Sequence, residues 1–195
     1  IEAVATGAGG RPGDFEPPGL SNLAWAFSAA AIQHPRLFRV IAEEATLKSR
    51  RFKPQELSGL VWAFGKARAR DATLLQGLVD EAAAKLHAFA PRNLSSLAWA
   101  VAALGWTGLP LLRGISAEAL AKLRGFEPQG LSNIAWAFAT ARLDEPDLLR
   151  ASATAAAAQL QAFRPQELTN LLWAFATLAA GDAWEKLRPA AVRQI

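Results

Sequence analysis

The stretch from Phe126 to Phe138 reads FEPQGLSNIAWAF, and versions of it occur five times along the chain. The other four read FEPPGLSNLAWAF, FKPQELSGLVWAF, FAPRNLSSLAWAV and FRPQELTNLLWAF, and they begin at Phe15, Phe52, Phe89 and Phe163. The tryptophan near the end of each copy follows the previous one by 37 residues without drift. A fixed period of this length is typical of repeat proteins, in which each repeat stacks on its neighbours.

The composition of the 195-residue chain agrees with such an array. Hydrophobic residues make up 52% of it, which is enough for a continuous core. There is no cysteine, so disulfides and thiolate metal sites are excluded. No run of 18 or more apolar residues is free of charge, so we expect no membrane-spanning segment. The net charge of +4 is compatible with a polyanionic partner without requiring one.

Each copy predicts a first helix, A, that begins at its proline, because proline suits the first helical position. In the first copy, Leu20, Leu23, Ala24 and Phe27 follow the i, i+3, i+4, i+7 spacing of a core-facing stripe. Phe15 precedes the helix at the spacing of a hydrophobic staple to Leu20. Most residues at the N-cap position are poor caps, so we expect packing to hold the helix starts; they are Glu16, Lys53, Ala90, Glu127 and Arg164.

A short connection and a second, more variable helix, B, follow in each repeat. Its apolar positions are Leu37, Phe38 and Ile41, with counterparts Leu74, Leu75, Leu78, Leu111, Leu112, Ile115, Leu148 and Leu149. The predicted fold is all-α, an α-solenoid of about five stacked 37-residue helix-turn-helix repeats at 15–51, 52–88, 89–125, 126–162 and 163–195.

The two ends of the chain depart from the repeat. Residues 1–14 are rich in glycine and proline and are predicted to be a linker. The fifth copy loses register, since Trp184 and Leu187 miss the helix B positions and Pro189 would kink a helix there. The chain begins at Ile1 and contains no methionine, so we expect it to be a piece of a longer protein.

The repeated element F-x-P-Q-x-L-[ST]-N-L-x-W-A-F-A resembles the octotricopeptide repeat family, and above all its 37-residue variant, the heptatricopeptide repeats often found with RAP domains. The resemblance covers about Phe15 to Leu178. The departures are Gly59 and Ser96 in place of the usual Asn, and Arg92 with Asn93 in the third copy. No RAP domain is visible in this chain.

The resemblance implies an organellar RNA-binding protein, in a mitochondrion or plastid. Its members govern transcript processing, stability or translation, or form structural parts of organellar ribosomes. The implied partners are single-stranded or looped RNA, including ribosomal RNA, and other ribonucleoprotein subunits. We expect no cofactor, membrane or small-molecule substrate. The alternative is a protein-interaction scaffold that binds peptides or subunits on its concave face.

No catalytic constellation emerges from the sequence. His34 and His87 occupy different repeat positions and are interpreted as isolated surface histidines. Asp144, Glu145 and Asp147 precede or begin a helix B, where acidic residues suit the helix dipole. An active site needs a convergent nucleophile, base and anion-binding group, so we expect no enzymatic activity and no metal site.

The repeated tryptophan is open to two interpretations. At 100° per residue it points about 150° away from the centre of the core stripe of its own helix. It either packs in the groove between adjacent repeats or offers a ring on which a base stacks. Five fully exposed indoles would leave a long apolar strip, so packing between repeats is favoured; they are Trp25, Trp62, Trp99, Trp136 and Trp173.

Two variable rows flank the tryptophans on the same arc of helix A. Small polar residues that vary at fixed repeat positions suit base reading, although bridging between A helices explains them equally without the resemblance. The first row begins at Pro18, and its candidate base contacts are Gln55, Arg92, Gln129 and Gln166. The second row, in which every member is a candidate, is Asn22, Gly59, Ser96, Asn133 and Asn170.

Basic residues gather around the second helix A. Cations near a helix C-terminus stabilise the helix, but this group is larger than that effect explains. They are the candidate contacts to RNA phosphates, seven cations within 23 residues: Lys48, Arg50, Arg51, Lys53, Lys66, Arg68 and Arg70.

Overall fold

The computed structural model describes residues 14–69, 72–106 and 108–178, and this part of the chain is helical without a strand. The predicted linker up to residue 13 and the off-register Trp184, Leu187 and Pro189 lie outside the described residues. Nowhere in the described ranges is there a helix long and apolar enough to span a bilayer.

Every A helix begins at the proline of its repeat, as predicted from the sequence. The A helices are α2 (Pro17–Ala29), α4 (Pro54–Ala67), α6 (Pro91–Ala103), α8 (Pro128–Thr140) and α10 (Pro165–Thr177). In none of α2, α6 and α8 does the N-cap side chain accept a hydrogen bond from the first turn. The Glu56 carboxylate of α4 instead accepts the Lys53 backbone N–H at 2.8 Å. The Glu167 carboxylate of α10 likewise accepts the Arg164 backbone N–H at 2.9 Å, so two of the five A helices have a capping bond and the other three begin without a side-chain cap.

The B helices are α3 (Pro35–Leu47), α5 (Ala72–Ala84), α7 (Leu109–Ala121) and α9 (Pro146–Ala158). Short 3-10 turns lead from each B helix to the next A helix: η2 (Ser49–Arg51), η3 (Leu86–Ala88), η4 (Leu123–Gly125) and η5 (Leu160–Ala162). The chain is thus a succession of antiparallel helix pairs, and the A helices all run in the same direction.

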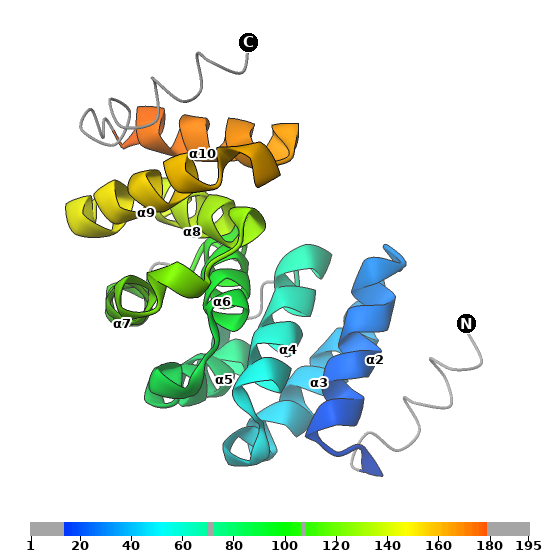
Figure 1. Ribbon diagram of the computed structural model, residues 1–195. Helices are drawn as coiled ribbons and strands as arrows, with labels where there is room; N and C mark the ends of the chain where they lie inside the picture. The colour runs from blue at the N-terminus through cyan, green and yellow to red at the C-terminus, as the bar shows by residue number, and fades with distance from the viewer. Residues whose placement is uncertain (1–13, 70–71, 107, 179–195) are drawn as a thin grey trace.

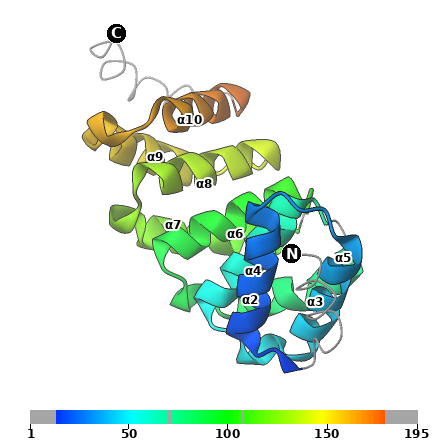
Figure 2. The same cartoon turned by 90° about the vertical axis from the view of Figure 1, so that its right-hand side faces the viewer.

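The helices form two curved layers, with the A helices on the inner side of the curve and the B helices on the outer side (Figure 1). Each A helix packs extensively against the next A helix, whereas successive B helices touch far less. Figure 2 shows the same succession from the side, with the pairs following one another from α2 to α10.

The core lies between the two layers and forms one continuous cluster through the described repeats. The predicted stripe of α2 is buried at Leu20, Ala24 and Phe27, and it meets the buried Leu37, Phe38 and Ile41 of α3. Between consecutive repeats, the rings of Phe38 and Phe64 contact edge to face, with their centroids 5.3 Å apart. The hydrophobic spacing of the sequence therefore located the core correctly.

Small residues let successive A helices approach closely. A Cβ atom added to Gly65 of α4 would lie 3.2 Å from the backbone of Ala100 in α6, tighter than ordinary van der Waals contact. Ala63, Ala100, Ala137 and Ala174 all occupy the repeat position of Ala100, and all are fully buried. A larger side chain at these positions would force the helices apart.

A side-chain hydrogen bond joins the two ends of each of the first four repeats, from a lysine in three of them and from a glutamine in the fourth. The residue after each B helix donates a hydrogen bond to the carbonyl oxygen of the phenylalanine that opens the same repeat: Lys48 to Phe15 at 2.9 Å, Lys85 to Phe52 at 2.9 Å, Lys122 to Phe89 at 3.1 Å and Gln159 to Phe126 at 3.2 Å. Each lysine also pairs with a glutamate one turn earlier: Glu44, Glu81 and Glu118.

We expect Lys122→Met to lower the free energy of unfolding by about 1–2 kcal/mol, because it leaves the Phe89 carbonyl without its charged donor. Lys122→Gln should recover part of that loss, since Gln159 makes the equivalent bond in the fourth repeat. Urea unfolding of the two variants measures the difference. Equal losses would show that the stabilisation depends on the Lys122–Glu118 ion pair and not on the bond to the carbonyl oxygen.

Candidate nucleic-acid interface

The inner face of the A-helix layer carries one column of side chains per repeat. In α8 the column is Gln129, Asn133, Trp136 and Thr140, spaced i, i+4, i+7 and i+11 on the side away from α9. Gln129 and Thr140 are exposed, and the two residues between them are half-buried. We call the equivalent residues of all five A helices the inner columns. The sequence analysis did not single out their fourth row, although it continues the same spacing: Ala29, Lys66, Ala103, Thr140 and Thr177.

The central tryptophans stack on one another across the repeats. The ring centroids of Trp62 and Trp99 are 6.1 Å apart with 36° between the ring planes, and those of Trp99 and Trp136 are 6.1 Å apart with 29°. All three indoles are half-buried. The predicted packing between repeats is therefore confirmed for these three, and base stacking on the tryptophans stays a prediction.

The outermost tryptophans are more accessible. Trp25 is 55% exposed and Trp173 is 46% exposed, because α2 and α10 each have an A helix on one side only among the described residues. Of the five rings, these two offer the most free aromatic surface to a planar ligand.

The first candidate row lies fully on the surface: Pro18, Gln55, Arg92, Gln129 and Gln166 are all exposed. In α10, the Gln166 Nε2 atom donates to Oδ1 of Asn170 at 3.0 Å, one turn further along the same column. Both amides retain capacity for further hydrogen bonds, since each carries two donors and an acceptor with two lone pairs.

The second candidate row lies at the seam between adjacent A helices. Asn22 is exposed in the first helix, and the later members are half-buried: Gly59, Ser96, Asn133 and Asn170. A Cβ atom at Gly59 would stand 3.1 Å from Oγ of Ser21 in α2. A side chain at this position would therefore require the Ser21 hydroxyl to shift by a few tenths of an ångström.

The candidate phosphate contacts do not form one patch. Lys48, Arg50, Arg51 and Lys53 lie before the first turn of α4, and Lys66 and Arg68 lie at its end. A 14-residue helix separates the two groups, which is about 20 Å at 1.5 Å per residue. They flank the α4 column at its two ends. Arg70 lies outside the described residues.

Two of these cations already have partners in the protein. The Lys48 ammonium group holds the Phe15 carbonyl oxygen and pairs with Glu44, and Arg51 pairs with Glu16 of the first repeat. Arg50, Lys53, Lys66 and Arg68 are exposed. These four are the better placed of the predicted group to contact a phosphate, whereas the Lys48 ammonium group is already bonded within its own repeat.

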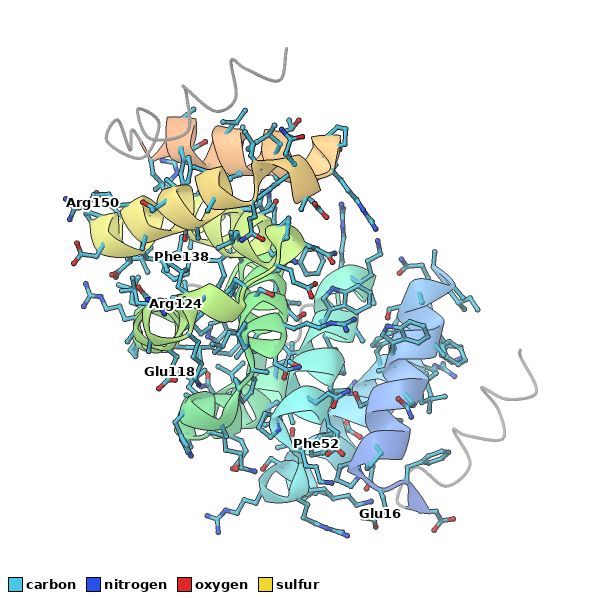
Figure 3. The ribbon with its side chains drawn as sticks, in the orientation of Figure 1. Glu16, Phe52, Glu118, Arg124, Phe138 and Arg150 are labelled. Carbon is cyan, nitrogen blue, oxygen red and sulfur yellow. The ribbon has the colours of Figure 1, made fainter. Side chains whose placement is uncertain are left out.

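The inner columns carry little charge. Their ionisable members are Lys66 and Arg92, one in α4 and one in α6, and the other members are Asn, Gln, Ser, Thr, Trp or small residues. Charged residues concentrate at the turns and on the outer layer, where Figure 3 shows Glu118 and Arg150 pointing away from the A helices. The inner face suits a ligand that presents neutral hydrogen-bonding groups and planar or apolar surface.

His34 is not the isolated surface histidine predicted from the sequence, because it is half-buried and bonded within the protein. His34 caps α3, because its Nδ1 atom accepts the Leu37 N–H at 3.1 Å. His87 is exposed in η3, and Glu145 lies 3.4 Å from Oγ of Ser116. Within the described ranges, no three His, Asp or Glu side chains are grouped to hold a metal ion.

Neither protein-family models nor curated proteins show a match to this chain. The geometry of the inner columns is therefore the main observation on which a function can be based.

We expect Trp99→Ala to lower the free energy of unfolding by about 3 kcal/mol, because Trp99 stacks on a ring at each side. The matched change Trp173→Ala should cost about 1 kcal/mol or less, since nearly half of that side chain is exposed. Thermal and urea unfolding of both variants measure the contrast. Similar losses at the two positions would contradict a stabilising role for the stacked indoles.

Proposed function

We propose that this chain is an α-solenoid that binds single-stranded or looped RNA along its inner face, without catalysing a reaction. The two layers, the parallel A helices and the strict 37-residue step support this architecture. In such an array, successive repeats present equivalent side chains to successive units of an extended ligand.

The observation that carries the proposal is the composition of the inner columns. Each combines an indole with at least one polar side chain, and these polar residues differ from repeat to repeat, as with Asn133 in α8 and Ser96 in α6. Asn and Gln offer a donor and an acceptor, which can pair with the edge of an unstacked base. Trp25 and Trp173 supply exposed rings, and stacking on an aromatic ring tolerates any base.

The cations at the ends of the columns suit the sugar-phosphate backbone. Lys66 and Arg92 belong to the columns themselves, and Arg50, Lys53 and Arg68 lie just beyond the ends of α4. Phosphate contacts fix the position of a strand and leave base selection to the neutral residues. The resemblance to the heptatricopeptide repeats supports the same assignment, and the proposal includes a location in a mitochondrion or plastid and a role in transcript metabolism or an organellar ribonucleoprotein.

The second candidate is a scaffold that binds an extended peptide on the same face. The near absence of charge in the columns favours it, because amides can also pair with a peptide backbone and indoles can cover apolar side chains. The two candidates differ in salt dependence, which is steep for a strand held through phosphates and shallow for a neutral peptide.

Binding of a fluorescently labelled, mixed-sequence single-stranded RNA, measured over a range of salt concentrations, tests the proposal. The double variant Lys66→Ala/Arg92→Ala should bind more weakly, and its plot of log K against log salt should be shallower by about 1.4, or about 0.7 per lost contact. The matched control Arg39→Ala/Arg113→Ala removes the same charge from the B layer and should match the unaltered protein.

Equal effects of the two double variants would show that the RNA responds only to net charge and not to the inner face. Absence of RNA binding, together with salt-insensitive binding of a peptide, would replace the proposal by the scaffold function.

A further inference from the structure

The turns that lead from each B helix to the next A helix lie on one edge of the array, because the A helices all run in the same direction. We call this edge the turn edge. The middle residues of its four 3-10 turns occupy one repeat position, and all four are exposed: Arg50, His87, Arg124 and Gln161. Two are arginines, one is a histidine and none is acidic. We call these four residues the turn row.

The side chains of the turn row are not neutralised by the protein. Within residues 14–69, 72–106 and 108–178, none of the four forms an ion pair or a hydrogen bond with another side chain. The arginine row of the B layer is different, because each of its members has an acidic partner: Arg39 with Glu43, Arg113 with Glu145 and Arg150 with Asp147. The turn row therefore keeps its charge available for an anion from outside.

The backbone of the turn row is tied across the repeats. The Lys85 ammonium group, just before η3, donates to the Arg50 carbonyl oxygen of η2 at 2.9 Å. The Lys122 ammonium group, just before η4, donates to the His87 carbonyl oxygen of η3 at 2.7 Å. These bonds hold η2, η3 and η4 in a fixed succession, so the row starts from an ordered line of backbone.

The remaining charges of the turn edge are mostly positive or already engaged. Among the exposed N-cap residues, Lys53 and Arg164 are cations without an ion pair in the described part of the chain. Of the carboxylates, Glu16 pairs with Arg51, and Glu56 and Glu167 accept backbone N–H groups. Asp14 and Glu127 are the exposed acidic residues that oppose an anion there.

The turn row leads directly into the inner columns. In every repeat it stands four residues before the proline that begins the A helix, and five residues before the first member of the column. Arg50 is thus followed by Gln55, and Arg124 by Gln129. Packed helices lie about 8–10 Å apart, so the row offers one side chain at about that interval beside the columns.

We propose that the turn row binds the phosphates of a single-stranded RNA whose bases reach the inner columns, with Arg50, His87 and Arg124 each contacting the sugar-phosphate backbone. The inference rests on the proposed RNA binding, and it adds His87 and Arg124, which closeness in sequence did not group with Arg50. Arginine can hold a phosphate through two parallel hydrogen bonds. RNA is favoured over an acidic peptide because the adjoining columns offer rings for bases to stack on.

The first test removes charge from the turn row. In binding of a labelled, mixed-sequence single-stranded RNA, Arg50→Ala/Arg124→Ala should make the plot of log K against log salt shallower by about 1.4, or about 0.7 per lost contact. The matched control Arg39→Ala/Arg113→Ala removes two arginines of the B layer that are also two repeats apart, and its slope should equal that of the unaltered protein. All four positions are exposed, so circular dichroism should show an intact helical fold.

The second test adds charge. Gln161→Arg extends the turn row by one arginine in the fourth repeat, so RNA binding should tighten and the salt slope should steepen by about 0.7. The matched control Gln76→Arg adds the same charge to the B layer, at the repeat position of Arg39 and Arg113. This control should leave the slope unchanged.

The outcomes separate the inference from the function on which it rests. If RNA binds but the turn-row variants behave like their B-layer controls, the turn-row inference is wrong and the proposed function stands. If no RNA binds, both are wrong. If poly-glutamate binds in place of RNA, with a salt slope that depends on Arg50 and Arg124, the row serves an acidic protein partner and the inference is overturned.

Discussion

The close approach of successive A helices is the constraint on which the rest of the structure depends. Backbone comes within 3.2 Å of an added Cβ at Gly65, and the alanine row opposite it is fully buried in every internal seam. Tight packing on the A side and sparse contact between the B helices curve the two layers, as Figure 1 shows. The same seam holds the inner columns at a regular step, so a structural requirement creates the surface proposed to bind RNA.

The two faces of an A helix differ in how much their residues vary from repeat to repeat. The face toward the B layer keeps an apolar residue at every repeat because it fills a continuous core, and its variation is limited to changes such as Phe to Val at Val101. The opposite face keeps only the tryptophan, and its other positions vary among polar residues, Pro, Gly and Ala. Trp62, Trp99 and Trp136 contribute both to packing between repeats and to the inner surface, since each stacks on a neighbouring ring and stays partly open to solvent.

Much of the local structure was predictable from the sequence, because helix starts and core stripes depend on residues close together in the chain. Pro17 and its counterparts mark the start of every A helix, and the spacing of Leu20, Ala24 and Phe27 identified the buried face. Long-range features were not predictable. Lys48 appeared to be one cation of a basic cluster, but its ammonium group bonds a carbonyl oxygen 33 residues earlier. Closeness in sequence also suggested that seven cations act together, whereas α4 separates the six that the structure describes into two groups.

Ultraviolet crosslinking of bound RNA to the unaltered protein, followed by mass spectrometry of the crosslinked peptides, tests the central claim most directly. If RNA lies along the inner face, the crosslinks fall on A-helix peptides, above all on those with the exposed Trp25 and Trp173, and the B-helix peptides stay unmodified. Crosslinks confined to the B helices, or to the turns that join them to the A helices, would contradict the account.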